Sequence, residues 1–280
     1  MNRDKRTVLA KQTLSILEAG SYRAPSGNTV SLAEPMKAAL EGTRLYRPAD
    51  FPESLTPATG REEGRTRIEV TAETTLEAAQ RVQEESKEDG TLVLNIASAK
   101  NPGGGFLNGS QAQEESLARS SGLYPCLLLA REMYDYHREL GTCLYSDHMI
   151  YTPDVPVFRD DAGTLREAPY CVSFISSPAV NAGAVRRNEP EKVTLIEPTL
   201  RERMRKILWL AMQHHYRTLI LGAWGCGVFQ NEPALVARLF AELLRPGTEF
   251  GSQFDRIVFA IYDRTETQEV LTAFRAQWEA

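Results

Sequence analysis

The chain has 280 residues, of which 25% are charged and 42% are hydrophobic, and its formal net charge is −5. A chain of this length buries most of its surface on folding, so it needs no disulfide or structural metal to be stable. Proteins that hold nucleic acids by bulk electrostatics are usually basic, so the acidic balance argues against a nonspecific DNA or RNA binder. A polyanionic ligand would have to be held locally, by main-chain N–H groups and a few placed arginines.

The sequence carries neither a targeting pattern nor a metal-binding pattern. Its first residues are charged throughout, unlike a signal peptide, and no stretch approaches the roughly 20 apolar residues that span a bilayer. The cysteines are far apart, with no C-x-x-C pair and no nearby histidine, so neither zinc ligation nor a disulfide framework is expected. We therefore expect a cytoplasmic protein that binds no metal and needs no cofactor.

Two regions are expected along the chain. Residues 5–18 carry a partly amphipathic pattern that predicts a helix ending at Gly20. Residues 21–64 are rich in Pro, Gly and Ser, yet apolar residues recur through them, which predicts an irregular accessory segment packed on the core. We expect residues 1–65 to be an N-terminal extension and residues 66–280 to be the main domain, together forming one structural unit.

From Thr66 onward the sequence alternates between strand-like and helix-like segments. Strands are predicted at 67–71, 91–97, 149–157, 170–175, 218–221 and 256–262. Helices are predicted at 74–87, at 110–129 with a break near Gly122 and Pro125, at 200–215, at 232–244 and at 266–278. Such alternation is typical of an α/β domain whose largely parallel or mixed sheet is covered by helices on both faces.

Two glycine-rich loops follow apolar strands and precede helices. The first, at residues 101–110, follows the strand TLVLNIA, and the second, at residues 222–229, follows TLILG. Ligands bind at the carboxyl ends of strands in open α/β sheets, and glycines let main-chain N–H groups approach anionic oxygens. Neither loop is a G-K-[ST] phosphate loop or a G-x-G-x-x-G dinucleotide fingerprint. Either loop alone would be explained as well by a tight structural turn.

Two adjacent glutamates, Glu114 and Glu115, follow the first loop. Ser110 and Gln113 have the S-x-x-Q spacing of a capping box, which predicts a helix that starts at Gln111. Adjacent side chains on a helix point about 100° apart, so one glutamate would face a ligand while the other braces it. The plain alternative is that both only complement the helix dipole. The dipole lowers a carboxyl pKa, whereas a neighbouring carboxylate and a bound diphosphate raise it, so the sequence leaves the protonation states open.

These residues carry a resemblance to a known family. The string Gly103-Gly-Gly105, seven residues, then Gln113-Glu114-Glu115 resembles the GGG-x(6–8)-QEE signature of poly(ADP-ribose) glycohydrolases. Four segments are similar to the compact bacterial form of that family, so the resemblance covers most of the chain: NIASAKNPGGGFLNGSQAQEESLARSSGLYP, TLSILEAGSYRAPSGNTV, ISSPAVNAG and LGAWGCGVFQNEP. It implies a macrodomain-like three-layer α/β/α fold with a mixed central sheet, an N-terminal helical extension and an ADP-ribose cleft.

The same resemblance implies hydrolysis of the ribose–ribose O-glycosidic bonds of poly(ADP-ribose), with Glu115 as general acid and base and Glu114 holding hydroxyls of the cleaved ribose. Main-chain groups of the second loop would wrap the diphosphate, and Phe229 would pack on the ribose. The residues implied to line the substrate site are Asn101, Gly103, Gly104, Gly105, Gln113, Gly225, Cys226, Gly227, Val228 and Phe229. The expected partners are poly(ADP-ribose), ADP-ribose and poly(ADP-ribosyl)ated proteins of the DNA damage response. We expect no membrane, no direct DNA binding and a monomeric state.

Three alternatives stay open on the sequence alone. A reader domain would bind ADP-ribose without cleaving it, although a reader needs no acid at residues 114–115. A hydrolase of another ADP-ribosyl compound would differ by its inactivity on long polymer. A nucleotide phosphatase is disfavoured, because the sequence has no metal-ligand cluster or phosphate-nucleophile motif. Within the second loop, Cys226 is either a reactive thiol or a small residue that leaves space.

Overall fold

The computed structural model describes residues 1–55, 66–85 and 90–278. Its main strands are β3 (Arg44–Tyr46), β4 (Arg67–Thr71), β5 (Thr91–Ile96), β6 (Met149–Arg159), β7 (Leu165–Ser177), β8 (Thr218–Leu221) and β9 (Arg256–Ala260). Within the described ranges these strands form one sheet in the order β3-β6-β7-β5-β8-β9-β4. β6 pairs antiparallel with β3 and β7, and the pairs from β7 through β5, β8 and β9 to β4 are parallel. The predicted mixed sheet is confirmed.

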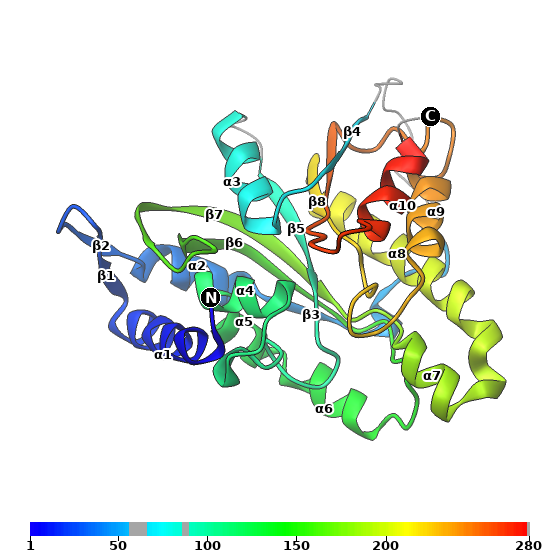
Figure 1. Cartoon of the computed structure of the whole chain (residues 1–280), viewed down its shortest axis with the longest axis horizontal. Helices are drawn as coiled ribbons and strands as arrows, with labels where there is room; N and C mark the ends of the chain where they lie inside the picture. Colours follow the sequence, from blue (N-terminus) through cyan, green and yellow to red (C-terminus); the bar gives the residue numbers. More distant parts are fainter. Residues whose placement is uncertain (56–65, 86–89, 279–280) are drawn as a thin grey trace.

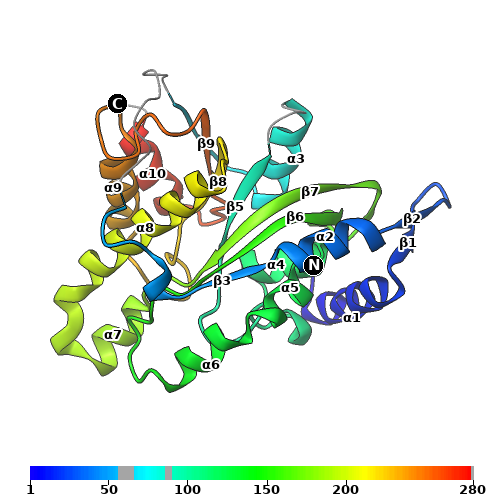
Figure 2. The ribbon, with the colours of Figure 1, turned by 180° about the vertical axis from the view of Figure 1, so that it is seen from behind.

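Side chains alternate across the sheet and build two cores. In β5, the buried side chains of Leu92 and Leu94 join one core, and that of Val93 joins the other. The first core is covered by α7 (Ala182–Asn188), α8 (Ile196–Gln213), α9 (Pro233–Leu244) and α10 (Glu269–Trp278). The second is covered by α2 (Ala33–Gly42), α3 (Thr75–Glu85), α4 (Gln113–Ser120), α5 (Leu123–Leu129) and α6 (Arg131–Glu139). Figures 1 and 2 show the resulting three layers, which confirm the predicted α/β/α architecture.

The N-terminal region is more regular than the sequence indicated. After α1 (Arg3–Ala19) come a small hairpin of β1 (Ser21–Arg23) and β2 (Thr29–Ser31), then α2, and then β3, which pairs with β6 at the edge of the main sheet. The prediction of an irregular segment at 21–64 is therefore wrong for its described part. Each strand here has three residues, too few for an alternating pattern to show. The expected boundary at 65/66 borders residues 56–65, which lie outside the described ones.

Other boundaries also moved. β6 and β7 are longer than predicted, and they are joined as a hairpin. Not predicted from the sequence were α6 and α7, or the 3-10 helices η1 (Pro48–Asp50), η2 (Phe106–Asn108) and η3 (Pro190–Leu195). α8 begins at Ile196 rather than at Leu200, and α10 begins at Glu269 rather than at 266. The last two residues of the helix predicted at 74–87 lie outside the described part of the chain.

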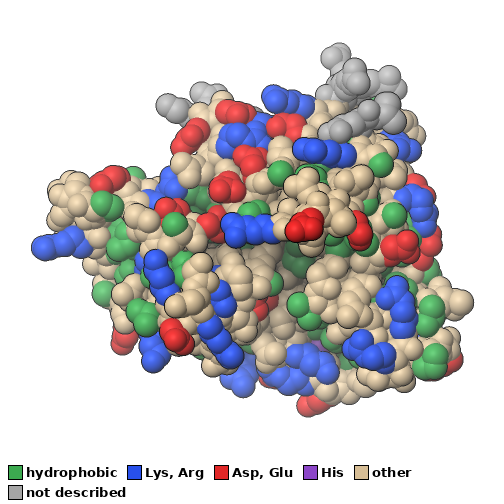
Figure 3. Space-filling model, viewed as in Figure 1, with side chains coloured by type: hydrophobic (Ala, Val, Ile, Leu, Met, Phe, Trp, Pro, Cys, Tyr) green, Lys and Arg blue, Asp and Glu red, His purple; other side chains and the backbone are tan. Residues whose placement is uncertain are grey.

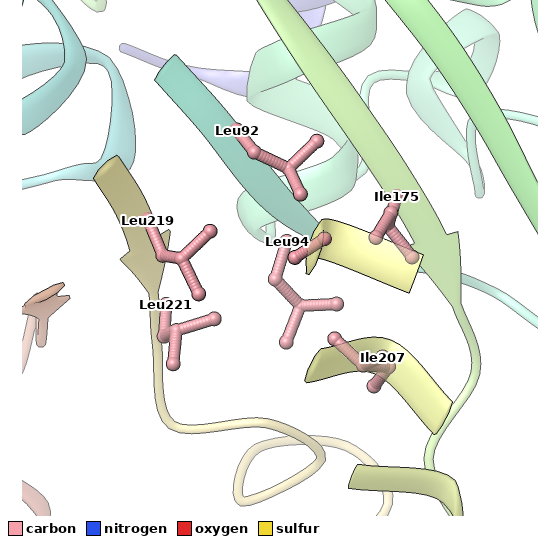
Figure 4. Close-up of a pocket in the computed structure, with 7 residues that line it drawn as sticks. Leu92, Leu94, Ile175, Ile207, Leu219 and Leu221 are labelled. Carbon is pink, nitrogen blue, oxygen red and sulfur yellow. The ribbon is translucent and has the colours of Figure 1, made fainter. Parts of the chain in front are cut away.

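A small apolar cavity lies between the sheet and α8 (Figure 4). Its volume is about 10 Å³, room for no more than one water molecule, so we assign it to the core and not to a ligand. The residues that line it are Leu92, Leu94, Ile175, Ile207, Ala211, Leu219 and Leu221. Over residues 1–55, 66–85 and 90–278, no helix is long and apolar enough to cross a bilayer. The same ranges contain no cluster of three or more His, Cys, Asp or Glu side chains that could hold a metal ion.

Candidate active site

The sheet brings the two glycine-rich loops to the same edge. β5 lies between β7 and β8, and all three run parallel, so the loops that follow them meet at their carboxyl ends. These loops are residues 97–112, 178–181 and 222–232. Figure 3, which has the view of Figure 1, shows a hollow near the middle of the molecule. This edge of the sheet is therefore the candidate active site.

The first glycine-rich loop folds tightly against the start of α4. The N–H of Gly104 donates to the carbonyl of Asn101 at 3.0 Å, and Gly104 has φ +60°, in the left-handed region that favours glycine. A Cβ on Gly104 would lie 2.4 Å from Oε1 of Glu115 and 3.3 Å from Oε2 of Glu114. The loop thus passes directly over both glutamate carboxyl groups, and only glycine permits this approach.

The helix that carries the glutamates begins at Gln113, with Ala112 as its N-cap and no side-chain cap. The predicted capping box at Ser110 is wrong. The N–H of Ser110 bonds back to the carbonyl of Gly105 at 3.1 Å, which closes the loop and leaves Ser110 outside the helix. The helix therefore starts two residues later than predicted, and Glu114 and Glu115 lie in its first turn.

The carboxyl group of Glu114 points into the protein, towards β5. Its side chain is only 3% exposed. Oε2 accepts a hydrogen bond from the N–H of Ser98 at 2.6 Å, and Oε1 accepts one from Nδ2 of Asn95 at 3.3 Å. Burial raises the pKa of Glu114 to about 8, against the lowering effect of these hydrogen bonds. Glu114 is therefore largely protonated at neutral pH.

The side chain of Glu115 points towards the glycine-rich loop and is half-buried. Its Oε1 accepts a hydrogen bond from the N–H of Gly105 at 3.0 Å. The two glutamates therefore have different surroundings, as the helical geometry predicts. The buried, neutral Glu114 stands beside the more accessible Glu115.

Gln113 makes its side-chain hydrogen bonds to the protein. Its Oε1 accepts from the N–H of Ile96 at 2.7 Å, and its Nε2 donates to the carbonyl of Leu94 at 2.8 Å and to Oγ1 of Thr75 at 3.2 Å. The hydrogen bonds to Ile96 and Leu94 fix the start of α4 to the main chain of β5. At the other end of the loop, Asn101 is exposed, and its main chain makes the turn.

The second glycine-rich loop is fixed by a buried asparagine. Asn231, only 2% exposed, donates from Nδ2 to the carbonyl of Val180 at 2.7 Å and to that of Gly225 at 3.1 Å. Gly225 has φ +76°, and a Cβ there would lie 2.4 Å from Nδ2 of Asn231. Gly227 has open space around its Cβ position, and Val228 is 84% exposed. The tip of the loop therefore projects into solvent from a rigid base.

Cys226 and Phe229 differ in character within this loop. Burial raises the pKa of the Cys226 thiol to about 12, so it is not a thiolate at neutral pH, and a spacing role fits it better than a reactive one. The ring of Phe229 lies 5.9 Å from that of Tyr145. The carbonyl of Phe229 accepts from the N–H of Gly183 at 3.0 Å, so both its ring and its main chain are held.

Three residues of this site were not found from the sequence. Asn95 interrupts the apolar strand TLVLNIA with a fully buried amide, a signal that was present and not used. Asn231 follows the second loop, where its amide bonds main-chain carbonyls. Tyr145 lies in a segment without regular pattern, and its φ of +57° could not be read from the sequence.

Comparison with known proteins shows which proteins this chain is similar to. A family model described as microbial-type PARG, catalytic domain, matches residues 10–160, just over half of the chain. The poly(ADP-ribose) glycohydrolase of Thermomonospora curvata bound to the inhibitor ADP-HPD is 48% identical, with 99% of this chain and 100% of that chain covered and a TM-score of 0.91. A further structure of that protein is 47% identical, with the same coverage and a TM-score of 0.93. The Deinococcus radiodurans glycohydrolase in complex with ADP-ribose is 47% identical, with 87% and 97% covered and a TM-score of 0.80. The comparison with curated protein sequences gave no match.

Proposed function

Because this chain belongs to the family of microbial-type poly(ADP-ribose) glycohydrolase (PARG) catalytic domains, we propose that Glu115 carries its acid–base chemistry. The protein is an enzyme that hydrolyses the ribose–ribose O-glycosidic bonds of poly(ADP-ribose) and releases ADP-ribose. The observation that carries the assignment is the place of Glu115, at the end of β5 and under the glycine-rich loop, where the N–H of Gly105 orients one carboxylate oxygen.

Glycosidic cleavage needs a proton on the leaving ribose oxygen. It also needs a water molecule that attacks the anomeric carbon. We propose that Glu115 donates the proton to the leaving ribose oxygen as the glycosidic bond breaks. Its carboxylate then takes a proton from the attacking water, whose oxygen bonds to the anomeric carbon. The cationic character that develops on the ribose is stabilised by the diphosphate of the substrate, and one carboxyl group serves both steps.

Glu114 is proposed to hold the hydroxyls of the cleaved ribose. Its two oxygens accept from Ser98 and Asn95, and the carboxyl group keeps its proton at neutral pH. A neutral carboxyl group can donate to a ribose hydroxyl, which a carboxylate cannot do. We propose that Gln113 acts on this pair by fixing the start of α4, rather than by touching substrate.

The second loop is proposed to hold the diphosphate. The N–H of Cys226 donates to the carbonyl of Ala223 at 3.0 Å, so Gly225 and Gly227 are the better candidates for N–H donors to phosphate. Phe229 would pack on the ribose, with the exposed Val228 beside it. In the first loop, Gly103, Gly104 and Gly105 would line the ribose and the diphosphate, and the exposed Asn101 would contact a ribose.

The test compares ADP-ribose release from purified poly(ADP-ribose) by the native protein, Glu115→Ala and Glu115→Gln, with ADP-ribose binding measured by calorimetry. We expect both variants to lose activity by at least ~10³-fold and to keep their affinity for ADP-ribose within a few-fold. Glu269→Gln, an exposed glutamate in the first turn of α10, is the matched control and should be fully active. Binding without release by the native protein would mean that the domain is a reader.

Several features of the cellular role stay predictions. We expect the terminal ADP-ribose on poly(ADP-ribosyl)ated proteins to survive, because the proposed catalyst faces a ribose–ribose bond. A cytoplasmic location, a monomeric state, a role in the DNA damage response and the lack of direct DNA binding also stay predictions. Size-exclusion chromatography with light scattering and an assay on mono-ADP-ribosylated protein would test two of these points.

A further inference from the structure

Arg119 is a buried cation close to the candidate active site. It has no part in the reaction proposed for Glu115. It lies in the last turn of α4 and is only 4% exposed. Burial lowers its pKa to about 10, so it keeps its charge at neutral pH. A buried charge is costly unless its donors are satisfied, so the partners of this guanidinium indicate what it does.

The guanidinium of Arg119 reaches back along α4 to the residues that precede the helix. Side chains on a helix lean towards its N-terminus, and Arg119 follows Glu115 by four residues, so both lie on one face. Nη1 donates to the carbonyl of Ser110 at 2.8 Å. Nη2 donates to Oε1 of Gln111 and, at 3.3 Å, to Oγ of Ser116. One side chain therefore joins the end of the loop to the body of the helix.

These contacts continue to the carboxylate of Glu115. Arg119 holds the carbonyl of Ser110, and the N–H of Ser110 donates to the carbonyl of Gly105 at 3.1 Å. The N–H of Gly105 in turn donates to Oε1 of Glu115 at 3.0 Å. The main chain of Ser110 and Gly105 thus links the guanidinium to the carboxylate through a series of three hydrogen bonds.

Resting on the proposed function of Glu115, we propose that Arg119 is a positioning residue for this reaction, which sets the orientation of the Glu115 carboxylate through Ser110 and Gly105. The helix has no side-chain N-cap, and the guanidinium fixes the residues just before it by donating to the carbonyl of Ser110 and to Oε1 of Gln111. The proposed N–H donors to the diphosphate and the ring of Phe229 lie in the second loop, whereas the guanidinium of Arg119 bonds Ser110, Gln111 and Ser116. Its loss should therefore reduce turnover and leave binding nearly intact.

The experiment measures kcat and KM for ADP-ribose release, ADP-ribose affinity and thermal unfolding for Arg119→Met and Arg119→Lys. Activities are measured at a temperature where each variant is folded. We expect Arg119→Met to lose about 30-fold in kcat, with KM and ADP-ribose affinity within about threefold of the native values. Arg119→Lys keeps the charge and one or two donors, so it should recover part of the lost kcat.

Two further variants keep the test decisive. Gln111→Ala removes one exposed acceptor of the guanidinium. It should lower kcat about threefold without changing the melting temperature. This variant serves as the test if Arg119→Met fails to fold. Arg256→Met is the matched control, a buried arginine paired with Glu69 and Glu85 at the start of β9, and it should lower stability but not kcat. An unchanged kcat in folded Arg119→Met would overturn the positioning role. If Arg119→Met does not fold, an unchanged kcat in Gln111→Ala would overturn it. Retained activity in Glu115→Ala would instead overturn the proposed function.

Discussion

Gly104 and Glu115 lie so close that no side chain fits between them. A Cβ on Gly104 would be 2.4 Å from Oε1 and 2.9 Å from Cδ of Glu115. The carboxyl group that we assign as the catalyst is therefore confined between the glycine-rich loop on one side and its own helix on the other. A substitution of Gly104 would move the catalyst or the loop.

Gly104→Ala should reduce kcat by about 10²-fold, because the new methyl group displaces the carboxyl group of Glu115. It also places alanine at φ +60°, a strain of roughly 1 kcal/mol. Gly247→Ala separates these effects, because Gly247 has φ +80° and open space around its Cβ position. The control should lose similar stability and no activity, as measured by steady-state kinetics and chemical unfolding. Equal activities of the two variants would show that the close contact is unimportant.

Stability should depend on pH through Glu114. Its pKa is about 8 in the folded protein against an ordinary 4.5, so between these values the folded state keeps a proton that the unfolded state has lost. The free energy of unfolding therefore falls as pH rises through this window. Glu114→Gln removes the effect, and we expect its stability relative to the native protein to improve by about 3 kcal/mol from pH 5 to pH 8. Urea unfolding at four pH values measures this.

The control for Glu114→Gln is Glu269→Gln, at an exposed glutamate. Its free energy of unfolding should equal that of the native protein at every pH. A constant offset between Glu114→Gln and the native protein across the range would mean that Glu114 is ionised in the folded state. In that case its proposed donation to a ribose hydroxyl would fail as well.

Phe229→Ala should raise KM about tenfold and change kcat less, because the ring is proposed to hold the ribose and not to react. Tyr145→Leu, which removes the ring that packs on Phe229, should give a smaller rise in KM. Leu129→Ala, an exposed apolar residue at the end of α5, is the control and should behave as the native protein. Initial rates over a range of polymer concentrations decide the matter, and an effect confined to kcat would contradict the binding role.

Thr13→Val tests how α1 supports the catalytic helix. The fully buried Thr13 donates from Oγ1 to the carbonyl of Arg119 at 2.5 Å, and valine keeps the shape but leaves that carbonyl without this donor. We expect a loss of roughly 1–2 kcal/mol in the free energy of unfolding. Thr248→Val removes a hydrogen bond to the carbonyl of Arg245 at the surface and should cost less than half as much. Equal losses in the two variants would argue against a special role for the α1 contact.

The sequence was most informative where local chemistry and position coincide. The apolar strands before both glycine-rich loops have a pattern that fixes their place in the sheet, so the loops could be assigned to its carboxyl edge. The different directions of Glu114 and Glu115 followed from helical geometry alone. The neutral state of Glu114 did not, because it depends on burial under segments that are distant in sequence.

Failures arose where a tertiary contact overrides a local rule. Ser110 has capping-box spacing, but its N–H donates to the carbonyl of Gly105 and its carbonyl accepts from Arg119, so it lies outside the helix. The resemblance assigns Gln113 to the substrate site, and the sequence did not predict that its amide also bonds the main chain of β5. β3 has only three residues, and its partner β6 lies about a hundred residues further along the chain. No local sequence pattern therefore predicts β3.

The protonated thiol of Cys226 has a consequence for chemical probes of this enzyme. Electrophiles that label cysteine react with the thiolate, and at a pKa of about 12 only about one molecule in 10⁵ carries one at neutral pH. We therefore expect an ADP-ribose analogue with such an electrophile near its diphosphate, which we propose binds at the second loop, to label Cys226 only slowly. Selective covalent labelling would therefore have to be directed at a carboxyl group, and Glu115, the more accessible of the two glutamates, is the suitable target.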